Sequence, residues 1–548
     1  MIKALDLRTP WPWLSLAALV VLITFILYAL VNILTASFGV GDVENGWSRL
    51  LTDPRGLSAI VNTLILAAIV TCTCVLIGVP LAYVTARYRF FGKSIIALLP
   101  LITLVIPEVI SAQTWLMALG NNGLITRFFR DFGIHLPSFY GWFGLITVMT
   151  FVYYTYVYIG TVASISGFDV HLEEAAQSLG TSPARSRIKV MLPVILPSIL
   201  ASALLVFTMV VGNFAISMIL SNQLPLLSVV TYQAAVSEGG AAPVMQSTFA
   251  TVSVVMVMLI LFFNRWIVSR GRFEIAQGRG ARPQPITGWK GAAIGLAASF
   301  IVVVSLVPLA VIAVGAFTVS RGPVMQWGNW TLANMERVFV TAPQPLVNSL
   351  IYAGAATLIG VAFSAVVSYL IIKKRNAVTP WLDYISSVPL ALTGTVLGIG
   401  LVVSFNAGWL PLTGTATIMV LALLVRRLPF GMRSAQATLY NIPNSIEEAS
   451  ISLGSPPLRT FFKGVLPMMG PAIASAAILT WTTSVSELSA SILVYSGGRE
   501  TLTIQVFRLI GSNLMAYASA YGLVLIAVIL IPIVVATKVF KVDVFASK

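Results

Sequence analysis

The chain has 548 residues, of which 58% are hydrophobic and only 9% are charged. Soluble domains carry about 25% charged residues, so this composition excludes an ordinary soluble protein and indicates a polytopic membrane protein. The formal net charge of +15 would suggest nucleic-acid binding in a soluble protein, but the positions of the basic residues give it another meaning.

Apolar runs long enough to cross a bilayer as helices recur along the whole chain. Six such runs in each half return the chain to the side on which it began, so the two halves have the same orientation. We therefore predict an all-α polytopic membrane protein built from two parallel six-helix repeats. The predicted spans are about 14–36, 57–83, 94–118, 140–165, 194–220, 247–268, 291–316, 347–372, 381–405, 413–432, 469–494 and 517–537.

Two polar segments, 173–199 and 447–473, are near copies that are identical at 13 of 27 positions. They lie 274 residues apart, which is half of the chain, so one unit has been duplicated and fused. We predict a first repeat at 1–268, a linker at 269–290 rich in Gly, Pro and Arg, and a second repeat at 291–548.

The basic residues predict the orientation of the chain in the membrane. Of the 33 Lys and Arg residues, 25 fall on one side and 8 on the other, with Arg426 and Arg427 counted in a loop on the richer side. The positive-inside rule places the richer side in the cytoplasm, together with both termini and both polar segments. The net charge therefore reflects topology, and we expect no nucleic-acid partner.

Each polar segment has the pattern of two short helices. Asp169 can cap the first helix of the first copy, and Ser445 with Glu448 forms a capping-box pattern in the second. Gly180 and Gly454 are expected to end these helices, because proline follows each glycine closely. We predict a helix–turn–helix knob that protrudes into the cytoplasm in each half.

These segments resemble the EAA loop of ATP-binding-cassette importer permeases, whose pattern is E-A-A-x₃-G-x₉-I-x-L-P. The spacing is intact in both copies, at 173–193 and 447–467, although Ser450 replaces the second alanine and Val190 and Gly464 replace the isoleucine. The residues that fit the pattern are Glu174, Ala175, Ala176, Gly180, Leu192 and Pro193 in the first copy, and Glu448, Ala449, Gly454, Leu466 and Pro467 in the second. Asn62-Thr63-Leu64, Asn348-Ser349-Leu350 and Ser486-Glu487-Leu488-Ser489-Ala490 are also similar to the ferric-iron branch of this family.

The resemblance implies a type I permease fold in the bacterial inner membrane, and the transport subunit of an ATP-driven importer that depends on a solute-binding protein. Implied partners are two copies of an ATPase, which would carry ATP and Mg, a periplasmic or extracellular solute-binding protein, and membrane lipid. The chain itself would bind no cofactor and have no catalytic residue. Ferric iron is the favoured substrate; 2-aminoethylphosphonate, a phosphorylated sugar, thiamine or a polyamine are alternatives. The residues implied in coupling to the ATPase are Glu173, Glu174, Ala175, Ala176, Gly180, Glu447, Glu448, Ala449 and Gly454.

Polar residues within the predicted spans mark a possible solute pathway. Glu487 lies in the middle of a span, where an ionisable group costs roughly 2.5–3.5 kcal/mol, and Asn213 lies 274 residues earlier. The two residues either line a central path or only form hydrogen bonds between helices. Glu108 is a further candidate, for which a structural role is favoured. If Glu487 serves the pathway, Glu487→Ala is expected to impair uptake in a folded, assembled protein.

Two strings mimic ATPase motifs without their context. Gly92-Lys93-Ser94 resembles the end of a P-loop, but Arg87 stands where the first glycine is needed, and Ser496-Gly497-Gly498 falls in a predicted external loop. The sequence has no His, Cys and carboxylate cluster with metal-ligand spacing. A twelve-span secondary transporter is the main alternative, but it leaves the paired knobs unexplained. A channel or scaffold is the third, but no span carries a ring-forming pattern of charges.

Overall fold

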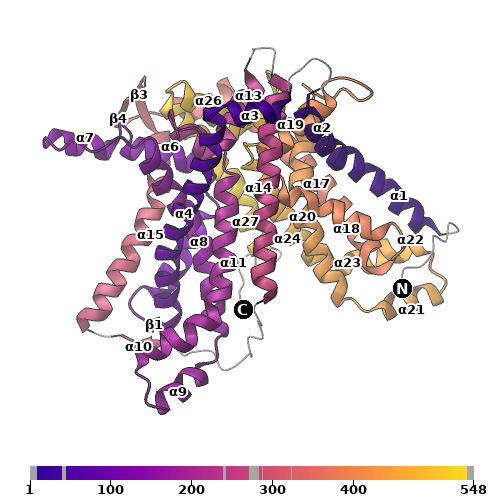
Figure 1. The fold of residues 1–548 in the computed structure, drawn as a ribbon, viewed down its shortest axis with the longest axis horizontal. Coiled ribbons are helices and arrows are strands. Elements are labelled where there is room, and N and C mark those ends of the chain that lie inside the picture. Colours follow the sequence, from indigo (N-terminus) through magenta and orange to yellow (C-terminus); the bar gives the residue numbers. More distant parts are fainter. Residues whose placement is uncertain are drawn as a thin grey trace.

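The computed structural model describes residues 9–39, 45–237, 242–270, 283–286, 288–322 and 324–539. They form a helical protein with two short strand pairs (Figure 1). Within this part of the chain, eight helices are long and apolar enough to cross a membrane, or up to eleven if each bent pair is one span. A further helix of 26 residues, α20, occupies the tenth predicted span and carries three arginines. The predicted all-α polytopic fold is confirmed.

The elements follow one another in a similar order in the two halves. Those of the first half are α1 Pro10–Leu22, α2 Tyr28–Ser37, α3 Gly46–Thr52, α4 Pro54–Arg87, β1 Tyr88–Arg89, α5 Lys93–Thr103, α6 Glu108–Leu119, α7 Leu124–Asp131, α8 Trp142–Gly167, α9 Val170–Ser178, α10 Pro183–Ser186, α11 Leu192–Val211, α12 Ala215–Leu220, α13 Leu227–Val236 and α14 Ala242–Arg270. Those of the second half are β2 Gln284–Pro285, α15 Gly288–Ala316, β3 Thr318–Arg321, β4 Val324–Trp330, α16 Ala333–Glu336, α17 Gln344–Lys373, α18 Thr379–Ser387, α19 Gly394–Phe405, α20 Ala416–Asn441, α21 Asn444–Ser452, α22 Pro457–Thr460, α23 Leu466–Met468, α24 Gly470–Val485, α25 Ser491–Val494, α26 Leu502–Gly511 and α27 Met515–Val539. Short π or 3₁₀ turns at Ile23–Leu27, Arg187–Met191, Arg337–Thr341, Val388–Ala391 and Phe461–Val465 extend neighbouring helices.

Three mutually packed helices form the centre of each half. They are α4, α8 and α11 in the first half, and α17, α20 and α24 in the second. Local signals fix where these helices begin: the Asp53 side chain accepts from the Arg55 amide at the start of α4, and Thr415 accepts from the Ile418 amide at the start of α20. Two large apolar cores, one centred on each bundle, hold the halves together.

The first span of each half crosses to the other half. Helix α2 packs against α14 of its own half but also against α19, and α1 packs against α18. In the same way α15 packs against α27 of its own half and against α5 and α6 of the first half. Figure 1 shows α1 reaching into the orange second half and α15 lying beside the indigo and magenta first half. Each half therefore completes the outer wall of the other.

The spans predicted at 94–118 and 381–405 are bent, and a third bend lies at the start of the span predicted at 469–494. The segments Lys93–Thr103 and Glu108–Asp131 meet at 108°, Thr379–Ala391 and Gly394–Phe405 meet at 115°, and Pro457–Met468 meets Gly470–Val485 at 71°. Pro107 lies at the first of these breaks, where its ring keeps the chain out of the helical conformation just before α6. The spans predicted at 194–220 and 469–494 are also interrupted, after Val211 and after Val485.

Both predicted knobs lie at the same end of the molecule, as α9 and α21 at the lower edge of Figure 1. The Asp169 side chain caps the first knob by accepting from the His171 amide, as predicted. The capping box in the second knob is absent: Pro443 is the N-cap residue of α21, and Lys373 bonds the Asn444 side chain beside it. Both helices end where predicted, because Gly180 and Gly454 adopt φ values of 86° and 85°.

The structure corrects the position of two basic residues. Arg426 and Arg427 lie inside α20, at its eleventh and twelfth residues, and not in a cytoplasmic loop. Removing these two from the 25 leaves 23 basic residues on the richer side, so the asymmetry of the loops persists. Most of the predicted linker, including 271–282, lies outside the described residues; its Gln284 pairs with Tyr88 between β2 and β1.

Candidate solute pathway and coupling loops

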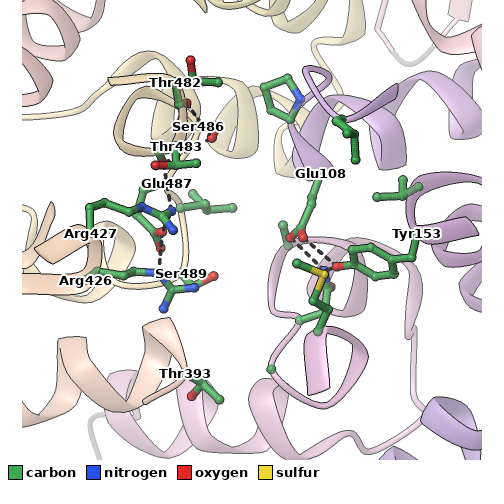
Figure 2. Close-up of a pocket in the computed structure, with 18 of the residues that line it drawn as sticks. Glu108, Tyr153, Thr393, Arg426, Arg427, Thr482, Thr483, Ser486, Glu487 and Ser489 are labelled. Atoms are coloured by element: carbon green, nitrogen blue, oxygen red, sulfur yellow. Dashed lines mark hydrogen bonds and ion pairs between the residues drawn. The ribbon is translucent and has the colours of Figure 1, made fainter. Parts of the chain in front are cut away.

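A cavity of about 570 Å³ lies between the two halves of the molecule. Its first-half wall comes from α6, α8 and α11, and its second-half wall comes from α20, α24 and the segment before α19. The three residues predicted for the solute pathway, Glu108, Asn213 and Glu487, all line it. Figure 2 shows Glu108 beside Tyr153 on one side of the cavity, and Glu487 with the arginines of α20 on the other.

The second-half wall is charged. The side chain of Glu487 is 3% exposed. One of its carboxylate oxygens forms ion pairs with two arginines, at 2.7 Å from Arg426 Nε and 2.5 Å from Arg427 NH2. Its other carboxylate oxygen accepts from the Ala490 amide at 3.1 Å. Arg427 NH2 also donates to the Thr483 carbonyl at 2.8 Å. Glu487 therefore joins α20 to α24 and at the same time holds the turn that follows α24.

The first-half wall has a network with a carboxylate but no basic residue. The Tyr153 hydroxyl donates to Glu108 Oε1 at 2.6 Å, and Asn213 Nδ2 donates to Glu108 Oε2 at 2.8 Å and to the Tyr153 oxygen at 2.7 Å. Asn213 Oδ1 accepts from the Ile216 amide at 3.0 Å and the Ser217 amide at 3.2 Å. Asn213 thus holds the turn after α11, as Glu487 holds the turn after α24.

The two walls are related by the internal repeat but differ in chemistry. An offset of 274 residues makes Tyr153 equivalent to Arg427 and Asn213 equivalent to Glu487. Asn213 donates a side-chain hydrogen bond to Tyr153 in the first half, and Arg427 donates one to Glu487 in the second. A second difference lies at the starts of α6 and α19, where Glu108 and Gly394 stand. A Cβ atom at Gly394 would overlap Ser489 and the Arg426 guanidinium, so glycine leaves room for the arginine that the first half lacks.

Sequence reasoning missed three residues of this site: Tyr153, Arg426 and Arg427. The two arginines interrupt an apolar run, and subtracting 274 from Arg427 leads to Tyr153. The offset that related Glu487 to Asn213 therefore makes Arg427 and Tyr153 equivalent, but it does not reveal their contacts.

The Asn62-Thr63 and Asn348-Ser349 pairs have a positioning role. Thr63 accepts from the Leu227 amide at 2.9 Å and Ser349 accepts from the Leu502 amide at 2.7 Å, at the first residues of α13 and α26. Asn348 also donates to the Gly498 carbonyl at 3.1 Å. Each pair fixes the loop that follows the broken span of its own half, and Ser496-Gly497-Gly498 belongs to that loop.

The two knobs, where residues for coupling to an ATPase were predicted, have one buried and one exposed acidic residue each. Glu173 is buried in an ion pair with Arg87, at the end of α4, and Glu447 is buried in an ion pair with Lys374, just after α17. Tyr369 also donates to Glu447 at 2.8 Å. Glu174 and Glu448, with Ala175, Gly180, Ala449 and Gly454, are exposed, whereas Ala176 is partly buried. The first acid of each copy therefore fastens the knob to a span.

The tip of each knob exposes a leucine. Leu179 is 88% exposed and Leu453 is 89% exposed, directly before the glycines that end α9 and α21. The two leucines are identical in the two copies, a signal that was available from the sequence. Apolar side chains that are this exposed at the same place in both halves suggest a surface that another protein covers.

Glu173→Gln is expected to loosen the first knob, whereas Glu174→Gln is expected to leave it intact. The first change leaves the Arg87 guanidinium, whose side chain is 11% exposed, without its counterion and costs roughly 3 kcal/mol. Amide hydrogen exchange in α9 should then accelerate by about 100-fold, since about 1.4 kcal/mol corresponds to a factor of ten. Equal exchange rates in the two variants would contradict this assignment.

No group of three or more His, Cys, Asp or Glu side chains that could hold a metal ion occurs among the described residues. The polar residues of the cavity instead offer hydrogen-bond donors and carboxylates that are already paired.

Two repeated helical bundles that face each other across a polar cavity, with a protruding knob on each, define a membrane transport protein with both halves in one chain. The chain belongs to the family described as binding-protein-dependent transport system inner membrane component, whose model matches residues 75–272 and 356–542, one match in each repeat. It is therefore a fused, two-domain permease of the ATP-binding-cassette importers and a multi-pass inner-membrane protein. This membership excludes the secondary-transporter, channel and scaffold alternatives.

Three relatives illustrate the similarity, and two of them match over most of the chain. The ferric transport system permease protein FbpB of Actinobacillus pleuropneumoniae is 25% identical over 534 residues, which cover 94% of this chain and 76% of the relative. The Fe(3+)-transport system permease protein FbpB 2 of Haemophilus influenzae is 27% identical over 545 residues, 97% of this chain and 99% of the relative. PhnV of Salmonella choleraesuis, which is named for 2-aminoethylphosphonate transport, is 28% identical over 250 residues, 45% of this chain and 94% of the relative.

Proposed function

We propose that this chain is the membrane permease of an ATP-driven importer that takes up ferric iron delivered by a solute-binding protein. The observation that carries the substrate is the similarity to two permeases named for ferric iron transport over 94% and 97% of this chain. The main alternative is an importer of the same class for 2-aminoethylphosphonate, supported by a relative that matches 45% of the chain.

Two copies of a separate ATPase would bind the two knobs, and the solute-binding protein would dock at the opposite end of the molecule. Two exposed knobs at one end support a pair of identical partners, because each presents the same leucine and the same exposed acid. ATP and Mg would reside on the ATPase, and this chain would bind no cofactor. The excess of Lys and Arg in the loops on the knob side supports a cytoplasmic location for the knobs and both termini.

A continuous mechanical connection supports transmission from the knobs to the cavity. In the first half one helical segment runs from Pro183, in the knob, to Val211, two residues before Asn213. Its 29 residues span about 44 Å at 1.5 Å per residue. The corresponding segment of the second half runs from Pro457 to Val485, two residues before Glu487, with a 71° bend. Movement of the knobs as the ATPases close would therefore reposition both cavity walls.

Reconstitution tests the proposed substrate. The chain, its ATPase and its solute-binding protein would be assembled in proteoliposomes, and ATP-dependent uptake of radiolabelled ferric iron and of 2-aminoethylphosphonate would be measured separately. We expect iron uptake that requires all three components and ATP, and no uptake of the phosphonate. Uptake of the phosphonate alone would contradict the proposed substrate. Uptake without an ATPase would contradict the proposed ATP-driven mechanism.

A further inference from the structure

The hydrogen-bonding groups of the cavity are unequally occupied. Each carboxylate oxygen already has a donor: Tyr153 and Asn213 donate to Glu108, while Arg427 and the Ala490 amide donate to Glu487. A cation would have to displace these donors in order to bind either carboxylate. The acceptor capacity of the cavity is thus largely committed.

The donors are in excess. Arg426 NH1 and Arg427 Nε are buried and have no hydrogen-bond partner, and Arg426 Nε is close to Glu487 without the alignment of a hydrogen bond. A guanidinium offers five N–H donors and no acceptor. The single carboxylate of Glu487 therefore cannot accept hydrogen bonds from all the donors of two guanidinium groups. Buried donors that lack partners are costly, and their persistence points to a ligand that supplies acceptors.

The surroundings of the arginines suit an acceptor-rich ligand. Gly394 lets the Arg426 guanidinium pack directly against the backbone at the cavity wall, because a Cβ atom there would collide with the guanidinium. Thr393, Ser486 and Ser489 line the same side of the cavity with hydroxyl groups. Figure 2 shows these residues around Arg426 and Arg427, with Glu108 on the far side.

We propose that Arg426 and Arg427 form a solute-binding site for an oxyanion group, meaning a carboxylate, phosphate or phosphonate. The inference rests on the proposed import function and specifies the chemistry of its cargo. For an iron importer, the metal crosses the membrane as a complex whose outer surface consists of carboxylate or phosphate oxygens, and not as a bare cation. Forked N–H donors match such oxygens in pairs, which explains arginine here in place of lysine.

Charge-selective thiol labelling tests the preference of the cavity. In full-length protein in lipid nanodiscs, with Cys72→Ser and Cys74→Ala as background, Ser486→Cys places a thiol in the cavity and Asn121→Cys places a reference thiol on an exposed loop. The probes are the anionic 2-sulfonatoethyl and the cationic trimethylammonioethyl methanethiosulfonates, with the neutral methyl reagent as the measure of access. We expect the anionic-to-cationic rate ratio to be about 10-fold higher in the cavity than at the reference site.

Variants that remove a positive or a negative charge are expected to change the labelling ratio in opposite directions. Arg426→Gln is expected to bring the cavity ratio down to the reference value, Arg426→Lys to retain most of the preference, and Glu108→Gln to raise it. Arg433→Gln is the matched control on the same helix, since Arg433 bonds Ser387 and does not line the cavity. A ratio at or below the reference value, the opposite response to Glu108→Gln, or a thiol that the neutral reagent cannot reach would each overturn the proposal.

Protection from labelling identifies the source of the oxyanion. Slower labelling by the anionic reagent in the presence of ferric citrate would support a metal complex, whereas slower labelling in 2-aminoethylphosphonate would support a free phosphonate. Protection by neither at millimolar concentration would overturn a solute site. None of these results depends on ATPase binding, so failure here is distinguishable from failure of the proposed import function.

Discussion

Glu487→Ala is expected to lower the free energy of unfolding by about 3–5 kcal/mol, because it leaves two arginines in a largely buried position without their shared counterion. This differs from the sequence-based expectation that the variant stays folded, because the ion pairs that join α20 to α24 become apparent only in the structure. The measurement is thermal unfolding of the purified protein, followed by tryptophan fluorescence. Glu500→Ala is the control: it removes an ion pair to Arg508, which is 51% exposed, and should cost under about 1 kcal/mol.

A compensated variant separates stability from transport. Arg426→Val, Arg427→Tyr and Glu487→Asn together copy Val152, Tyr153 and Asn213 from the equivalent positions of the first half. The triple variant should recover most of the lost stability, because a neutral hydrogen-bonded pair replaces the charged one. It should still fail to transport solute. A Glu487→Ala protein as stable as the Glu500→Ala control would contradict the role given to this ion pair.

Leu179→Asp combined with Leu453→Asp is expected to abolish binding of both ATPase copies, and each single change is expected to remove one. Burying each leucine on docking contributes roughly 2 kcal/mol, and a carboxylate at that place would also have to be desolvated, so affinity should fall by at least about 100-fold per knob. Because both leucines are almost fully exposed, the permease itself should unfold at an unchanged temperature. Co-purification of the ATPase with the permease gives the readout.

Leu332→Asp is the matched control for this experiment, since Leu332 is 72% exposed just before α16 and lies outside both knobs. ATPase binding should survive this change. Gly180→Arg with Gly454→Arg should also release the ATPases, but at an added cost of about 1–2 kcal/mol per site, because arginine is strained at positive φ. Full retention of the ATPase by the double aspartate variant would mean that the knobs contact their partner through other residues.

The sequence was informative where structure depends on short segments or on the repeat. Asp169, Gly180 and Gly454 act through their own neighbours along the chain, so the first knob's cap and the ends of both knob helices could be predicted. The cap of the second knob could not, because Pro443 and the contact between Lys373 and Asn444 replace the expected capping box. The offset of 274 residues brought Asn213 and Glu487 to equivalent places, and both line the cavity.

The sequence was uninformative where a side chain's role depends on a distant partner. Arg426 and Arg427 look like loop residues when basic residues are counted, because their counterion, Glu487, lies far away in the sequence, just after α24. Tyr153 sits in an apolar run and looks like a packing residue until Glu108 and Asn213 are seen beside it. The span predicted at 94–118 is bent before α6, where Pro107 lies, and the angle of the bend depends on packing between helices.

The two walls of the cavity carry different polar residues, and this difference depends on the covalent fusion of the two repeats. A permease assembled from two identical chains must place the same side chains on both sides of its axis, so it would set two arginine pairs face to face and repel itself across the gap. Two different chains could avoid this repulsion, but only if they always assembled as a heterodimer. A single polypeptide guarantees one copy of each wall, so the cavity is always asymmetric. Substitutions in one wall can then accumulate without changing the other.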